Sequence, residues 1–164
     1  AWEFYEQNKT NIEWDLVVLN PSFPPIHEIT GGPANLNMSL QYWYDAVLGE
    51  GSKSRERLSS SDVEIDVRDA ALAHVLALQK EAAGGERILI TGKSFIFQEW
   101  LDIINAIKPY PLPSHPLSQG FPELKRVYDV QYTREKQERI FGMKLRTIEE
   151  TARDILTDFS ARGW

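Results

Sequence analysis

The sequence predicts an α/β fold in which helices flank the short strands of a parallel sheet. Two apolar, β-branched runs, 14–19 and 87–91, have the pattern of strands buried on both faces, as parallel strands are. Helical spacing of apolar residues is found in 94–108 and 148–159. The chain has the length of one domain, and residues 1–164 are expected to share a single core.

The first residues have helical spacing but no side chain that could cap the first turn of a helix. Residues 1–9 are therefore predicted to be the last turns of a helix, and sequence that precedes them is expected to be missing. The strand at 14–19 is predicted to end at Asn20-Pro21, and the Pro- and Gly-rich stretch 22–33 should be a loop.

The middle of the chain is expected to alternate between helix and strand. A helix is predicted over 34–48, whereas the polar stretch 49–61 is expected to be mobile. Residues 63–65 alternate as a short strand does, and Asp66 is placed to cap the next helix, with Asp69 in its first turn.

Each of the two central helices is predicted to bury a stripe of apolar residues. The helix after Asp66 should end at Gly84-Gly85, and the helix within 94–108 should end before a Pro-rich stretch. The buried residues are expected to be Val67, Ala71, His74, Val75 and Leu78 in the first helix, and Phe97, Leu101, Ile104 and Ile107 in the second.

The last third is predicted to contain a strand at 127–130, a helix capped by Thr133 that ends at Phe141-Gly142, and a closing helix. The closing helix begins with Thr147-Ile148-Glu149-Glu150, which has the pattern of a capping box. Its buried side is expected to comprise Ile148, Ala152, Ile155, Leu156 and Phe159.

Composition excludes several classes of partner and chemistry. A net charge of −6 with scattered basic residues argues against nucleic acid. There is no cysteine, so disulfides and thiolate chemistry are excluded, and a reducing cytoplasmic location is expected. The apolar runs are too short to cross a bilayer, and three dispersed histidines give no metal signature, so neither a membrane nor a metal is expected.

Four of these features, in this order, resemble extended short-chain dehydrogenase/reductases, especially fungal ketoreductases, methylglyoxal reductases and dihydroflavonol reductases. They are the helix end at 1–9, the strand exit Val17-Val18-Leu19-Asn20-Pro21, the helix start Asp66-Val67-Arg68-Asp69 and the closing helix at Thr147-Ile148-Glu149-Glu150-Thr151. The resemblance covers nearly the whole chain. It implies the C-terminal half of such a reductase: a remnant of a Rossmann-type parallel sheet plus the small C-terminal substrate-binding subdomain.

The resemblance also implies that the family's catalytic Ser, Tyr and Lys lie in the other half. The chain has no Gly-x-x-Gly-x-x-Gly loop to hold a pyrophosphate, and no catalytic residue is predicted in it. Two Tyr-x-x-x-Lys spacings occur, Tyr5 to Lys9 and Tyr132 to Lys136. Packing is the better explanation for the first and a charged surface segment for the second.

The candidate cofactor contacts are Asn20, Pro21, Ser22 and Phe23. In the family, the loop that leaves this strand passes close to the nicotinamide of NADP, and ligands commonly bind beyond the carboxyl ends of parallel strands. Here Phe23 runs directly into a Pro-Pro pair, as though a few family residues were absent. A rigid strand-to-loop exit is the alternative interpretation.

The candidate substrate-binding residues are His27, Tyr42 and Trp43, and Tyr44 also has a suitable position for lining an apolar pocket. The alternative is that two of these three aromatic residues belong to the core. Arg68 is expected to be a solvated helix-start arginine or to pair with a carboxylate.

Two function classes remain. The first is the substrate-binding half of an NAD(P)-dependent carbonyl reductase, which is inactive alone and binds NADP only when the missing half completes it. The second is a non-enzymatic binding or interaction protein derived from that half, which forms a homodimer through the surface that the other half would cover.

Overall fold

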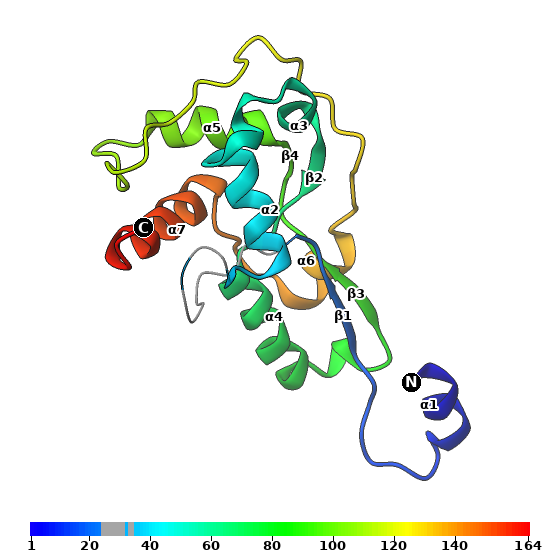
Figure 1. Ribbon diagram of the computed structural model, residues 1–164. Helices are drawn as coiled ribbons and strands as arrows, with labels where there is room; N and C mark the ends of the chain where they lie inside the picture. The colour runs from blue at the N-terminus through cyan, green and yellow to red at the C-terminus, as the bar shows by residue number, and fades with distance from the viewer. Residues whose placement is uncertain (24–31, 33–34) are drawn as a thin grey trace.

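The structure, a computed structural model, describes residues 1–23, 32 and 35–164, and its fold is α/β (Figure 1). In order, the helices and strands of the first half are α1 (Trp2–Asn8), β1 (Val18–Pro21), α2 (Met38–Val47), the 3-10 helix η2 (Glu50–Lys53), α3 (Arg55–Ser59) and β2 (Ser61–Val63). Those of the second half are α4 (Val67–Gln79), the 3-10 helix η3 (Glu81–Ala83), β3 (Arg87–Ile90), β4 (Ser94–Ile96), α5 (Phe97–Ala106), α6 (Glu135–Phe141) and α7 (Ile148–Ala161).

A parallel pair of strands, β1 and β3, carries one of two hydrophobic clusters, with Leu19 opposite Ile88. Helices α4 and α6 lie along this pair (Figure 1), and their side chains pack with Ile88 and Ile90. Leu89 points to the opposite face and is 39% exposed. The expectation that both strands are buried on both faces is therefore wrong for the described residues. Within them, β1 pairs on one edge only.

The second, larger cluster lies between α2, α3, α5 and α7 and includes Phe95 of β4, which pairs antiparallel with β2 (Figure 1). Its centre is aromatic. Trp43 and Trp100 meet edge to face with their ring centroids 5.6 Å apart, and Phe159 lies 6.3 Å from Trp43. Such edge-to-face pairs add to the stabilisation that burial of the rings provides.

The predicted caps Asp66 and Thr147 and two of the three predicted apolar stripes are confirmed. The prediction that Thr133 is the N-cap of α6 is wrong, because the residue directly before this helix is Arg134, whose side chain makes no capping hydrogen bond. Asp66 caps α4 by accepting the amide N–H of Arg68, and Gly142 ends α6 in the left-handed conformation. The stripes of α5 and α7 are buried at every predicted position.

The predicted stripe of α4 is wrong. Leu78 is 91% exposed and Val75 is 50% exposed, whereas the buried side consists of Asp69, Ala70 and Ala73. Small alanine side chains let the helix approach the β1–β3 pair closely, so the larger apolar residues point outward. The helix also ends at Gln79, before the predicted Gly84-Gly85.

Four further local predictions need correction. The stretch 49–61 contains η2 and α3, because Ser54 caps α3 and Leu58 is fully buried. Residues 127–130 form no strand, and Val127 is 55% exposed. Residues Ser94–Ile96, predicted as the start of a helix, form β4 before α5 begins. The predicted 14–19 strand begins only at Val18.

The capping box of α7 gives a first testable prediction. The Thr147 hydroxyl accepts the amide N–H of Glu150, and the Glu150 carboxylate accepts the amide N–H of Thr147 at 2.7 Å. Thr147→Ala is expected to lower the free energy of unfolding by about 1 kcal/mol. Urea unfolding followed by circular dichroism measures this change, and Thr157→Ala, in the interior of α7, is the control for a general loss of threonine. An equal or larger cost for the control contradicts the cap.

No helix among the described residues has both the length and the apolar character needed to span a membrane. The same residues contain no group of three or more His, Cys, Asp or Glu side chains placed to hold a metal ion.

Candidate functional site

The residues predicted to contact the cofactor lie where β1 leaves the sheet. The amide of Ser22 donates to the carbonyl of Ile90 at 2.9 Å, and that of Phe23 donates to the carbonyl of Val63 at 3.0 Å. The Asn20 side chain accepts from Arg87 at 2.9 Å. Backbone pairing therefore continues past the end of β1. Ser22 still pairs with β3, and Phe23 pairs with Val63, the last residue of β2.

The Ser22 hydroxyl is the remaining polar group at this strand end. It is buried and has no hydrogen-bond partner among the described residues. Buried polar groups are normally paired, so an orphaned hydroxyl here suits a polar ligand that arrives from beyond the strand. The amides of Ser22 and Phe23 are already used, and Pro21 has none.

An apolar pocket of about 560 Å³ lies beside Phe23. We call it the Phe23–Tyr42 pocket. Its apolar lining comes from Phe23, Met38 and Tyr42, and its polar lining from Asn37, Ser39 and Asp62. The rings of Phe23 and Tyr42 meet edge to face with centroids 5.8 Å apart. Apolar walls with a few polar groups are typical of small-molecule sites.

The far side of the Tyr42 ring is held in place by Arg57. The Arg57 guanidinium carbon lies 3.6 Å from the ring centroid, and Phe97 packs against the same ring at 5.3 Å. Cation–π contacts of this kind stabilise an aromatic side chain in one orientation. The wall of the pocket is thus supported from behind.

The structure separates the aromatic residues predicted to bind substrate. Tyr42 lines the Phe23–Tyr42 pocket, but Trp43 is fully buried in the core and Tyr44 packs against Phe159. His27 lies outside the described residues. Tyr42 is therefore the residue of the three aromatic candidates that reaches a pocket near the end of β1.

Sequence reasoning missed the pocket residues contributed by the start of α2 and by β2. Asn37 caps α2 through its side-chain oxygen, which accepts the amide N–H of Leu40 at 3.0 Å. An asparagine directly before a helical pattern is a recognised start signal, but the helix was predicted to begin earlier. No local signal links Asp62 to Met38, because the fold alone brings them together.

In both Tyr-x-x-x-Lys spacings the lysine pairs with a carboxylate. The Tyr5 hydroxyl donates to Asp15 at 2.6 Å, and that hydrogen bond, with burial, raises the pKa of Tyr5. Lys9 pairs with Glu6. In the second spacing, Tyr132 is half exposed and Lys136 pairs with Glu86 at 2.6 Å. The Tyr5 hydroxyl and both lysines therefore have carboxylates of the chain itself as partners.

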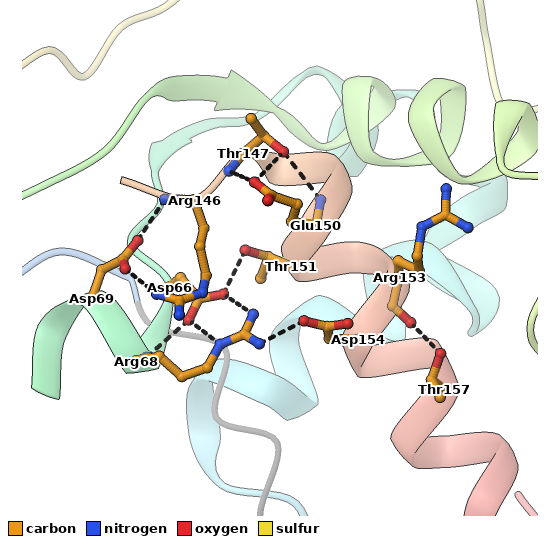
Figure 2. Close-up of polar contacts among 10 residues, drawn as sticks. All are labelled: Asp66, Arg68, Asp69, Arg146, Thr147, Glu150, Thr151, Arg153, Asp154 and Thr157. Atoms are coloured by element: carbon orange, nitrogen blue, oxygen red, sulfur yellow. Dashed lines mark hydrogen bonds and ion pairs between the residues drawn. The ribbon is translucent and has the colours of Figure 1, made fainter. Parts of the chain in front are cut away.

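A polar network joins the start of α4 to α7 (Figure 2). Asp66, 1% exposed, accepts from the Arg68 guanidinium at 2.7 Å and from the Thr151 hydroxyl at 2.8 Å. Arg68 also donates to Asp154 at 2.6 Å. Burial alone would raise the pKa of Asp66, but the hydrogen bonds from Arg68 and Thr151 lower it to about 2.

A second set of polar contacts, between α4 and the residue before Thr147, lies beside this network (Figure 2). The fully buried Asp69 accepts the amide N–H of Arg146 at 2.7 Å and pairs with its guanidinium. Of the two alternatives for Arg68, pairing with a carboxylate is confirmed. Because each buried carboxylate of this network already has an arginine partner, the network fixes α4 against α7 and offers no free acid or base.

Comparisons with known proteins support the resemblance that the sequence predicts. No protein-family model matches the chain. The chain is 29% identical over 158 residues to the NADPH-dependent methylglyoxal reductase GRE2 of Saccharomyces cerevisiae, a match that covers 94% of the chain and 45% of the relative. It is 33% identical over 159 residues to an uncharacterized oxidoreductase of the same yeast, with the same coverage of 94% and 45%.

A solved structure shows the same fold. The crystal structure of yeast methylglyoxal/isovaleraldehyde reductase Gre2 complexed with NADPH matches with a TM-score of 0.76 and 24% identity, over 99% of this chain and 48% of that one. The chain spans about half the length of the curated relatives it matches. These matches confirm the predicted resemblance to the C-terminal half of an extended short-chain dehydrogenase/reductase.

Proposed function

We propose that the chain is the substrate-binding half of an NADPH-dependent carbonyl reductase and that the Phe23–Tyr42 pocket receives a small aldehyde or ketone. The observation that carries this proposal is the position of the pocket at the carboxyl end of β1, where α/β proteins bind ligands. Two relatives named as NADPH-dependent methylglyoxal reductases support the substrate class. The absence of cysteine keeps a cytoplasmic location as our expectation.

The described residues fit only the reactive end of the cofactor. The orphaned Ser22 hydroxyl suits a polar group beside the pocket, whereas the described part of the chain has no glycine-rich turn that could hold a pyrophosphate. NADPH, when bound, supplies the hydride that reduces a carbonyl carbon. The chain itself contributes the apolar wall of Phe23 and Tyr42, which excludes water from the bound carbonyl compound.

The parallel strands suggest where the other half docks. Purely parallel sheets are normally covered on both faces, yet Leu89 is partly exposed and β1 has one unpaired edge in the described residues. We infer that the N-terminal half adds a strand to that edge and covers the face that carries Leu89. The chain alone is then expected to lack reductase activity.

A chimera tests this function. The N-terminal half of the yeast methylglyoxal reductase is joined to this chain in place of its own C-terminal half, and oxidation of NADPH is followed with isovaleraldehyde. We expect saturable activity from the chimera and none from the chain alone. Tyr42→Ala should raise KM about tenfold, a loss of about 1.4 kcal/mol, while the distant Tyr132→Ala should leave KM unchanged.

Two results contradict the proposal. A folded chimera that binds NADPH but does not reduce the aldehyde would show that the Phe23–Tyr42 pocket is not the substrate site. Oxidation of NADPH by the chain alone would show that the N-terminal half is not required.

The alternative of a self-associating, non-enzymatic protein is favoured by the exposed Val75 and Leu78 of α4. Sedimentation of the chain in the presence of the N-terminal half decides between the two functions, because a homodimer that persists supports the alternative.

A further inference from the structure

A second cavity lies apart from the Phe23–Tyr42 pocket, between the turn that joins β3 to β4, the helix α5 and the start of α7. Its volume is about 600 Å³. Its apolar lining comes from Ile103, Leu145 and Ile148, and its charged lining from Glu64, Lys93, Glu99, Arg134, Arg146 and Glu149. A cavity of this size and mixed lining suits a small organic molecule with one charged end.

Glu64 is the buried polar group of this cavity. Its residue is 3% exposed, and its carboxylate accepts the amide N–H of Lys93 at 3.2 Å. Gly92 leaves the room for this carboxyl group, because a Cβ at that position would collide with it and would lie 2.8 Å from the Glu64 carbonyl oxygen. Burial raises the pKa of Glu64 to about 7, and the negative charges of Asp66 and Asp69 act in the same direction.

Most other charged groups around the cavity have partners within the protein. Glu99 accepts from the Tyr128 hydroxyl, Glu149 pairs with Arg153, and Arg146 pairs with Asp69. Lys93 forms no ion pair with any described residue. Arg134 contacts Glu138 at 3.5 Å, one helical turn away, and its charge also acts on Glu64, where it opposes the rise in pKa. The charged lining of the cavity therefore keeps two cations and one buried carboxyl group available to a ligand.

We propose that this cavity binds a small organic carboxylic acid whose carboxylate lies between Lys93 and Arg134 and accepts a hydrogen bond from Glu64. The apolar body of the ligand packs against Ile103, Leu145 and Ile148. Two cations attract the ligand carboxylate, and the neutral Glu64 carboxyl group donates to it. An ionised Glu64 would repel the same ligand, so the site selects a carboxylate only when Glu64 carries its proton.

The direction of the pH dependence follows from this requirement. Glu64 is mostly neutral below pH 7 and mostly ionised above it. If only the neutral form binds, affinity is expected to be about tenfold higher at pH 6 than at pH 8. The charged or titratable groups that act on Glu64 or line the cavity with it are Asp66 and Asp69 at the start of α4, Lys93 in the turn, Glu99 on α5, Tyr128 and Arg134 before α6, and Arg146 and Glu149 beside α7.

The test uses the full chain and benzoate as the probe, titrated by calorimetry at pH 6 and pH 8. We expect saturable binding with about a tenfold preference for pH 6. Glu64→Gln keeps a hydrogen-bond donor and removes the titrating group, so it should bind with less than a twofold difference between the two pH values. Lys93→Gln should weaken binding at least tenfold, and Lys80→Gln, outside the cavity, should not change it.

Benzylamine, which has a similar ring and the opposite charge, should not bind. The proposal is overturned if benzoate does not saturate the chain at either pH, if its binding to the unmodified chain is independent of pH, or if Lys93→Gln binds as tightly as the parent. The readout requires no reductase activity, and Lys93 is an exposed residue, so its substitution is expected to leave the fold intact.

Discussion

Replacement of Trp100 by alanine is expected to lower the free energy of unfolding by about 3–5 kcal/mol, the cost of removing a large aromatic side chain from a packed core. Trp100 is fully buried, and its ring centroid lies 5.6 Å from that of Trp43 and 5.7 Å from that of Phe95. Domains of this size have only about 5–15 kcal/mol of stability in total. The variant should therefore unfold at a much lower urea concentration.

The matched control is Trp14→Ala, because Trp14 is 53% exposed. It should cost less than about 1 kcal/mol. Circular dichroism is the appropriate probe, since both substitutions also alter tryptophan fluorescence. Equal costs at the two positions would show that the aromatic cluster around Trp43 does not stabilise the chain as described.

Asp66→Ala is expected to cost about 2–4 kcal/mol at neutral pH, because it removes the cap of α4 and leaves the buried Thr151 hydroxyl without its acceptor. Asp66→Asn retains an oxygen that can cap the helix and should cost less. Asp154→Ala removes only the partly exposed partner of Arg68 and should cost about 1 kcal/mol or less.

The same network predicts a dependence on pH. The pKa of Asp66 is lowered from its ordinary value of 3.8 to about 2 in the folded chain. A lowered pKa in the folded state stabilises the protein above the unfolded pKa, and this stabilisation is lost as the pH falls from about 4 to about 2. The stability difference between the parent and Asp66→Ala should therefore shrink over this interval in acid unfolding experiments. A constant difference would contradict the ionised state of Asp66.

The helices that pack by one regular stripe were predictable from the sequence. In α5, for example, Phe97, Leu101 and Ile104 recur at helical spacing and are all buried. In α4, apolar residues occur on more than one side, so the pattern alone does not choose between the alanine side and the side with Val75 and Leu78. Contact with the β1–β3 pair makes that choice, and the sequence does not display it.

The candidate site was predictable only in part for a similar reason. The rule that ligands bind beyond strand ends points to the end of β1, and the Phe23–Tyr42 pocket lies beside it. Trp43, the neighbour of Tyr42, points to the core because successive residues on a helix face different directions. Asp62 and Glu64 were not singled out, since their surroundings depend on segments far away in the sequence.

The edge of β1 that has no neighbouring strand among the described residues affects how the protein must be handled. Backbone groups that lack a neighbouring strand can recruit one from another molecule, and this tendency grows with concentration. We expect the isolated chain to remain dispersed in dilute solution and to form strand-mediated aggregates when concentrated. A binding experiment at high concentration should therefore be accompanied by light scattering, and a short peptide that adds a strand at this edge should act as a solubilising agent.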